Sequence, residues 1–275
     1  MRERLTAASR RRAACCAILA AMVLGSSAAA AEDAAGGNAS VHDAQNPLAN
    51  VISVPFQNNT FFSDGPERKT ANILVFEPVV PFHIDQDWNL IARFVTPIVS
   101  APGLAPSQGT QFGLGNMQPA FYLSPAHPGE ILWGAGVKFY LPTETDSRLG
   151  VSKWGAGPAF AALTFQGPWT FGVLADNVWA GSQRGTRVNQ MTFNPFVFRN
   201  FSDGWYLVSS GIMTADWTAR GGQQWTVPVG GGFGRLFTVG PLPINARVQY
   251  LNNVERPSFA PKWQLQVQVQ FFLPG

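Results

Sequence analysis

Apolar and polar residues alternate without exception in the last segment of the chain. From Trp263 to Phe271, every odd position is apolar and every even position is glutamine. Such a strand has one apolar and one polar face, and its length suits the ~9–11 residues that a tilted strand needs to cross a bilayer. Because the polar face carries uncharged amides, the pattern favours a strand whose apolar side meets lipid and whose polar side lines a lumen.

Comparable short runs, separated by clusters of Gly, Pro, Asp and Asn, follow one another from about Ala49 onward. Twelve can be counted, at about 49–62, 70–83, 88–100, 114–124, 130–143, 153–165, 169–180, 189–200, 205–217, 223–237, 243–254 and 262–272. Tight turns such as 85–87 alternate with mostly longer polar connections such as 101–113. This pattern is typical of outer-membrane barrels, and an even strand number places both termini on the periplasmic side. It predicts an all-β fold, a transmembrane antiparallel up-and-down β-barrel of about 12 strands.

Several prolines fall inside these runs and oppose part of the assignment, because each removes a hydrogen-bond donor from the sheet. They include Pro78, Pro97, Pro119, Pro195 and Pro228. Bulges are expected to accommodate some of them.

Tryptophan gives a second indication of membrane insertion, because the indole ring favours the boundary between lipid and water. None of the nine tryptophans falls in mid-strand. Those that follow short turns are expected to form one aromatic girdle: Trp88, Trp133, Trp169 and Trp205. Those beside the opposite loops are expected to form the other: Trp154, Trp179, Trp217, Trp225 and Trp263.

The first residues have the pattern of an export signal, with arginines ahead of an apolar run and small residues after it. The apolar run, Ala13 to Leu24, is shorter than the ~20 residues of a spanning helix, so a signal anchor is the weaker alternative. We expect a cleavable signal peptide over residues 1–31, a flexible periplasmic linker over residues 32–48 and the barrel over residues 49–275.

Removal of this leader changes the charge balance. The leader holds 5 of the 19 basic and 1 of the 16 acidic residues, which leaves 14 basic and 15 acidic residues and a net charge of −1. Nucleic acid is therefore not an expected partner. Both cysteines, Cys15 and Cys16, leave with the leader, so neither a disulfide framework nor a cysteine-based metal or nucleophile site is expected.

Placing the apolar side of each strand toward lipid directs a set of polar side chains into the lumen. They are Glu77, Arg93, Lys138, Asp176, Arg247, Gln264, Gln266, Gln268 and Gln270. Glu77 and Arg93 lie across a tight turn on the same face and are expected to pair. Twelve strands should leave at most a narrow channel. The charges either contribute to selectivity or only hold a narrow lumen shut or solvated.

Six short motifs, spread over almost all of the expected mature chain, carry a family resemblance. They are PLANVISVPFQNN at 47–59, DWNLIAR at 87–93, KWGAGP at 153–158, GPWTFG at 167–172, DGW at 203–205 and WTVP at 225–228. Together they resemble the bacterial outer-membrane proteins grouped with the meta-pathway phenol-degradation barrels, some of which are called neuromedin U. The resemblance implies an outer-membrane channel or transport role and, through the association with phenol degradation, small aromatic or other apolar solutes. Asn116 stands where an acidic residue is expected in relatives.

The expected function is therefore an outer-membrane channel that passes small, aromatic or apolar metabolites through a narrow polar lumen. Expected partners are outer-membrane lipid, the barrel-assembly machinery during biogenesis and a small solute, and no cofactor or metal is expected. A structural or adhesive barrel without transport is the first alternative.

An outer-membrane barrel enzyme acting on lipid is the second alternative. Hydrolysis by a Ser–His pair needs a histidine within about 3 Å of its nucleophile. The three histidines, His42, His83 and His127, fall in the expected linker, at a periplasmic strand end and in a periplasmic turn. Two other features are weak: the glycine-rich run 230–234 lacks the strand–helix context of a phosphate loop, and Glu144 with Asp146 supplies too few oxygens for calcium. Enzymatic activity is not expected.

Overall fold

The computed structural model of this chain describes residues 40–65, 68–103, 109–181 and 187–273. The described residues belong to one compact unit. The expected signal peptide and residues 32–39 of the expected linker lie outside the described residues. Within the described ranges, no helix combines the length and the hydropathy that crossing a membrane requires.

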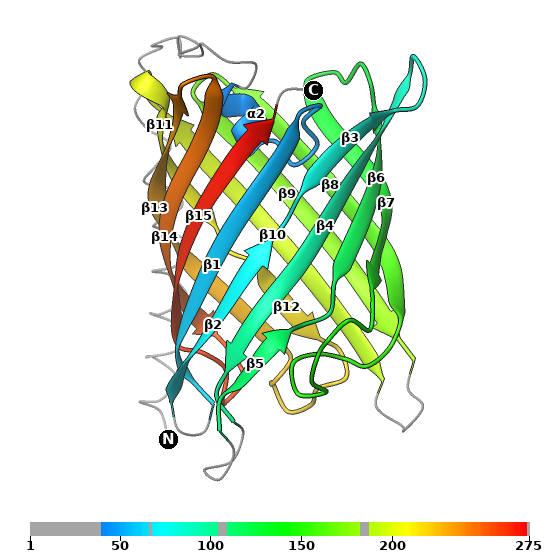
Figure 1. The fold of residues 1–275 in the computed structure, drawn as a ribbon, viewed down its shortest axis with the longest axis vertical. Helices are drawn as coiled ribbons and strands as arrows, with labels where there is room; N and C mark the ends of the chain where they lie inside the picture. The colour runs from blue at the N-terminus through cyan, green and yellow to red at the C-terminus, as the bar shows by residue number, and fades with distance from the viewer. Residues whose placement is uncertain (1–39, 66–67, 104–108, 182–186, 274–275) are drawn as a thin grey trace, which may run out of the picture. The chain divides into compact units, whose positions relative to one another are not determined.

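The described residues form a closed antiparallel barrel of twelve strands, as the sequence pattern predicts (Figure 1). Three of the strands are interrupted once, so the sheet consists of fifteen segments. The segments are β1 (Ile52–Asp64), β2 (Lys69–Phe76), β3 (Val79–His83), β4 (Trp88–Ala101), β5 (Gln111–Leu114), β6 (Gln118–Pro125), β7 (Ile131–Tyr140), β8 (Gly155–Gln166), β9 (Trp169–Ala180), β10 (Val188–Asn200), β11 (Trp205–Ser210), β12 (Met213–Asp216), β13 (Trp225–Val239), β14 (Leu242–Glu255) and β15 (Trp263–Leu273). Pairing of β15 with β1 and of β9 with β10 closes the barrel.

The interruptions and a bulge accommodate two of the in-strand prolines. Pro78 lies in the break between β2 and β3, and Pro228 lies at a register shift between β13 and β14. Pro97, Pro119 and Pro195 remain inside paired strands, opposite a residue of the neighbouring strand. Each proline removes only one donor, so a long ladder tolerates it.

The two ends of the barrel differ in their connections (Figure 1). One end, which we call the short-turn end, carries the turns after β3, β6, β8, β10 and β13, together with the start of β1 and the end of β15. The turn after β10 contains the short helix η1 (Ser202–Gly204). The opposite end, the long-loop end, carries the other connections, of which 141–154 is the longest that is fully described.

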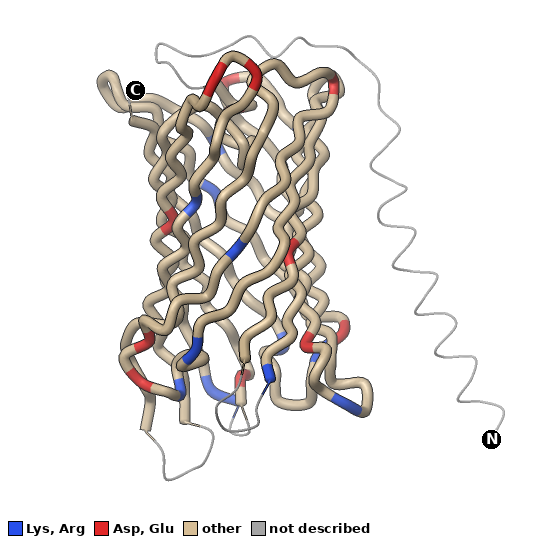
Figure 2. Tube along the Cα trace, turned by 90° about the vertical axis from the view of Figure 1, so that its right-hand side faces the viewer, with Lys and Arg blue, Asp and Glu red and all other residues tan. Residues whose placement is uncertain are grey.

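Side chains of β15 alternate between the two faces of the barrel wall. Val267 is 43% exposed on the outer face, whereas its neighbour Gln268 is 7% exposed on the inner face. Figure 2 shows that most of the barrel wall carries no charge, with charged residues gathered in the connections and a few at mid-height. An uncharged outer wall is what contact with lipid requires.

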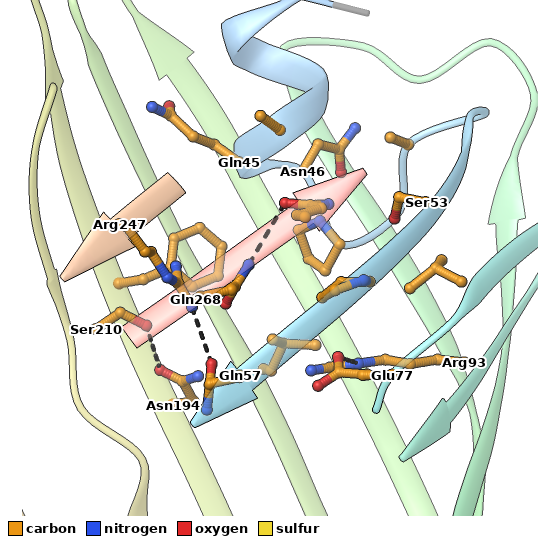
Figure 3. Close-up of a pocket in the computed structure, with 18 of the residues that line it drawn as sticks. Gln45, Asn46, Ser53, Gln57, Glu77, Arg93, Asn194, Ser210, Arg247 and Gln268 are labelled. Atoms are coloured by element: carbon orange, nitrogen blue, oxygen red, sulfur yellow. Dashed lines mark hydrogen bonds and ion pairs between the residues drawn. The ribbon is translucent and has the colours of Figure 1, made fainter. Parts of the chain in front are cut away.

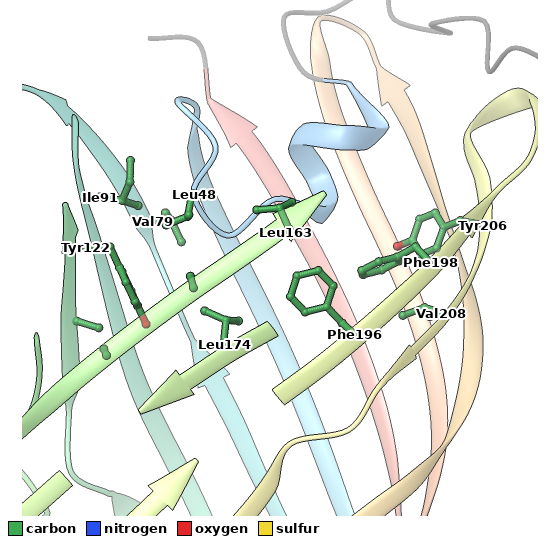
Figure 4. Close-up of a cluster of buried hydrophobic side chains, with 13 residues drawn as sticks. Leu48, Val79, Ile91, Tyr122, Leu163, Leu174, Phe196, Phe198, Tyr206 and Val208 are labelled. Carbon is green, nitrogen blue, oxygen red and sulfur yellow. The ribbon is translucent and has the colours of Figure 1, made fainter. Parts of the chain in front are cut away.

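The inner face of the barrel is not polar all round, which corrects the expectation of a polar lumen. A cluster of buried apolar side chains fills part of the interior toward the short-turn end (Figure 4). Its largest members include Ile91, Tyr122, Phe196, Phe198 and Tyr206. Apolar residues occupy both faces of β10, since Val197 lies between the buried Phe196 and Phe198.

The glycine-rich run 230–234 lies in β13, where this strand approaches β14 closely. A Cβ atom built on Gly232 would lie 1.8 Å from the carbonyl oxygen of Val248. The run therefore permits close strand approach, and it lies within a strand instead of between a strand and a helix.

Candidate functional site in the barrel lumen

The short-turn mouth of the barrel is occupied by residues 40–51, which we call the mouth segment. Its helix α2 (Val41–Gln45) begins with a capping box, in which Ser40 and Asp43 each accept a hydrogen bond from the other's backbone N–H. Residues 40–48 were expected to be flexible linker, and this part of the expectation is wrong. The chain orders here because Leu48 and Ala49 are buried, at 6% and 7% exposure.

Gln45 anchors α2 to the barrel wall through buried hydrogen bonds. Its Nε2 donates to Asn200 Oδ1 at 2.6 Å, and its Oε1 accepts from Thr170 Oγ1 at 2.6 Å. His42 stacks on Phe165 with ring centroids 4.3 Å apart. Since an unpaired buried amide costs about 1–3 kcal/mol, these contacts hold the helix in one position.

Below the mouth segment, charged side chains of the lumen form two ion pairs. Arg93 of β4 pairs with Glu77, which lies in the break between β2 and β3. Lys138 of β7 pairs with both carboxylate oxygens of Asp176 on β9, at 3.1 Å each. Pairing explains how these charges are tolerated inside the barrel, where an isolated charge would be costly.

Arg247 of β14 differs from the other lumen cations. Its Nη2 donates to Gln57 Oε1 at 3.3 Å, while its buried Nε has no hydrogen-bond partner. Among the described residues, no carboxylate forms an ion pair with it.

One wall of the lumen is a ladder of amides contributed by β14, β15 and β1. Gln249 Nε2 donates to Gln266 Oε1 at 2.6 Å, and Gln266 Nε2 donates to Asn59 Oδ1 at 3.0 Å. Nearer the mouth, Asn245 donates to Gln270 at 3.2 Å. Networks in which each amide bonds to its neighbours rigidify the wall without adding charge.

These walls and the mouth segment enclose a cavity of about 120 Å³ (Figure 3). Its lining includes Arg93, Glu77, Arg247, Gln57 and Gln268 on the polar side. Phe196, Phe198 and Leu174 contribute apolar surface, and Ala44, Gln45 and Asn46 close it toward the short-turn end. At ~10–15 Å³ for each water, this space is large enough for several waters or one small organic molecule.

All of the side chains predicted to face the lumen lie on the inner side of the barrel. The five charged residues cluster around the two ion pairs and the cavity. Gln264, Gln266, Gln268 and Gln270 are 8%, 3%, 7% and 7% exposed, and the last two line the cavity. The pairing of Glu77 with Arg93 is observed, and a role of these side chains in selectivity stays a prediction.

The tryptophans lie toward the two barrel ends. Trp88, Trp169 and Trp205 begin strands at the short-turn end, and Trp133 follows closely in β7. Trp179, Trp217, Trp225 and Trp263 lie at strand ends on the other side, and Trp154 precedes β8. Two arginines pack over short-turn aromatics: Arg199 over Trp169, at 5.1 Å to the ring centroid, and Arg235 over Trp205, at 5.2 Å. Cationic and aromatic groups together suit a lipid–water boundary.

Sequence reasoning missed the mouth segment and the role of Asn116. The signal for the former was present, because Ser40 and Asp43 have the spacing of a capping box. Asn116 sits in the break between β5 and β6, and its Nδ2 lies within hydrogen-bonding distance of Leu141 O, Glu144 Oε2 and Val151 O, at 2.7–2.9 Å. No local sequence pattern indicates those partners, since they lie 25–35 residues away.

The structure places the three histidines in α2, in β3 and in the turn after β6. His83 Nδ1 lies 3.1 Å from Asn89 Oδ1, and His127 is exposed in the turn after β6. Across the described ranges, no three His, Cys, Asp or Glu side chains gather closely enough to hold a metal ion.

No protein-family model matches the chain, and no curated protein matches it significantly. Among solved structures, the chain is similar to the COG4313 outer membrane channel from Pseudomonas putida F1, with 17% identity, a TM-score of 0.58 and coverage of 82% of this chain and 97% of that one. It is also similar to the NanC porin, with 10% identity, a TM-score of 0.51 and coverage of 82% and 100%. A calcium-bound phospholipase dimer from the Salmonella typhi outer membrane reaches a TM-score of only 0.40, at 12% identity and 82% and 91% coverage, which says nothing about activity. The chain therefore has the fold of outer-membrane channel and porin barrels.

Proposed function

We propose that this chain forms a narrow channel in the outer membrane for small solutes, with the mouth segment closing its short-turn end. The observation that carries the proposal is the interior at mid-height, where charged and amide side chains surround a cavity. A barrel that served only as a structural wall would fill this space with apolar side chains, at lower cost than with buried charges. The fold of the similar channel and porin supports the same role.

Two further points support small aromatic or apolar molecules as the solutes. The apolar side of the cavity, with Phe196 and Phe198, suits an aromatic or apolar body. The resemblance to the phenol-degradation barrels favours the same class, so membership in that family is part of the proposal. A barrel without transport is the competing function, and the occupied short-turn mouth favours it.

Conductance of the refolded chain in planar bilayers tests the proposal against this competitor. We expect small, infrequent conductance steps from the wild type, and steps at least several times more frequent from Leu48→Asp, because a buried carboxylate in the apolar cluster expels the mouth segment. Asn50→Asp places the same group at an exposed position of the same segment and should behave like the wild type.

Folding of each variant is checked by heat-modifiable migration on gels. If wild type and Leu48→Asp are both folded and neither conducts ions nor admits solutes into liposomes, the barrel has no transport function.

A further inference from the structure

Arg247 is the one lumen cation, among the described residues, that is left without a carboxylate. Arg93 and Lys138 each have one. Of the five charged side chains of the lumen, three are basic and two are acidic. The interior therefore carries an excess of one positive charge, located at Arg247.

An unpaired guanidinium in a protein interior is costly, and the usual compensation is an anion with acceptor oxygens. A guanidinium has five donors in a planar fork. Here Nη2 donates to the neutral oxygen of Gln57, and Nε has no partner. Donor positions of the guanidinium are therefore left free, and the two oxygens of one bound carboxylate could accept from them.

The surroundings of Arg247 define the rest of such a ligand. Figure 3 shows its side chain beside Gln57 and Gln268 at the wall of the cavity. Gln268 is its register partner on β15, and Gln57 is the partner of Gln268 on β1. Their amides can donate to or accept from a polar head group, while Phe196 and Leu174 offer apolar surface in the same cavity.

We propose that this cavity is a binding site for a small monocarboxylate, with its carboxylate on Arg247 and its apolar body against Phe196 and Leu174. One negative charge neutralises the interior, whereas a dianion would leave a net negative charge beside the carboxylate of Glu77. The volume of about 120 Å³ limits the ligand to roughly the size of a single ring, since an engineered cavity of about 150 Å³ accepts benzene. If the barrel is a channel, small monocarboxylates are its solutes, and this part of the proposal rests on the proposed function. Binding of a monocarboxylate to the cavity does not depend on transport.

Calorimetric titration of the refolded full chain in detergent tests the site with two pairs of probes. The pairs are benzoate against benzamide, and acetate against acetamide. Because only the carboxylates carry a charge, we expect at least one of them to bind at least tenfold more tightly than its amide. Equal affinity within both pairs, or no binding by either carboxylate, overturns the proposal.

Three variants locate the site. Arg247→Gln removes the charge, and Gln268→Glu places an internal carboxylate opposite Arg247; each should weaken carboxylate binding at least tenfold. Arg235→Gln removes an arginine from the outer face and should leave binding unchanged. If Arg247→Gln fails to fold, Gln268→Glu and the two probe pairs still test whether the carboxylate binds at Arg247. Unchanged binding in Gln268→Glu would overturn the site.

Binding and transport are read separately. Conductance without carboxylate binding would refute this site and leave the channel standing. Carboxylate binding without conductance or uptake would refute the channel and leave the site standing.

Discussion

At the scale of single residues, neighbouring positions of β15 face opposite environments. Val267 faces outward at 43% exposure, and Gln268 faces the cavity at 7% exposure. Both lie near the middle of the strand, so the same substitution at each position compares lipid with lumen at one depth.

Introducing glutamate at these two positions tests which face meets lipid. Val267→Glu should lower the free energy of unfolding by about 2 kcal/mol or block assembly, because a carboxylate at mid-membrane loses its hydration. Gln268→Glu should be far milder, because its carboxylate lies opposite Arg247. Denaturant titration of the barrel in liposomes measures both. Equal tolerance of the two substitutions would mean that Val267 does not face lipid or that Gln268 does not face the lumen.

At the scale of elements, the side chains of Asn116, Thr143 and Thr145 hold the connection 141–154 against the barrel. The Asn116 amide nitrogen lies within hydrogen-bonding distance of Leu141, Glu144 and Val151, and its oxygen accepts from the backbone N–H of Val151. A carboxylate at position 116 would face the Glu144 carboxylate, which now lies beside the Asn116 amide. Within the connection, hydrogen bonding from Arg148 lowers the pKa of the Asp146 carboxyl to about 2.

Asn116→Asp should therefore release this connection while leaving the barrel closed. It replaces an amide donor that three acceptors surround by a carboxylate that they repel, at a local cost of about 1–3 kcal/mol. Tryptic cleavage after Arg148, measured by mass spectrometry on the folded protein, should become roughly ten times faster. Asn50→Asp, at an exposed position of the mouth segment, serves as the control. Equal cleavage rates would show that the connection is held by other contacts.

At the scale of the whole molecule, the lumen charges act as one group. With Arg93, Lys138 and Arg247 against Glu77 and Asp176, the interior carries one excess positive charge. Removing two arginines reverses the sign to one excess negative charge. In a narrow pore, such groups act on ions at short range.

Neutralising Arg93 and Arg247 together, both to glutamine, should shift the anion/cation permeability ratio of the channel toward cations. The shift should be larger at about 0.1 M salt, where the screening length is ~10 Å, than at 1 M, where it is ~3 Å. Reversal potentials under a salt gradient measure it. The matched control, Arg199→Gln with Arg235→Gln, removes the same charge from outward-facing arginines at the short-turn end. If both pairs shift the ratio equally, the lumen does not determine selectivity.

The strand pattern could be predicted from the sequence, because a period of two is a local property of neighbouring residues. Alternation in the segment that became β15 placed Gln264, Gln266, Gln268 and Gln270 on the inner face. Local proximity also predicted the pairing of Glu77 with Arg93, since a tight turn brings the two strands together.

What fills the barrel depends on contacts between residues far apart in the chain, which the local pattern did not predict. Helix α2 has five residues, too few to be stable alone, and it forms because the barrel mouth buries its neighbours and pairs Gln45. Phe196 and Phe198 turned inward because β10 is apolar on both faces, so hydropathy alone did not distinguish lipid from lumen. Arg247 meets Gln57 across 190 residues of chain, because closure places β15 between β14 and β1. The lumen carboxylates Glu77 and Asp176 are paired with Arg93 and Lys138. Such long-range contacts depend on closure, which no local pattern encodes.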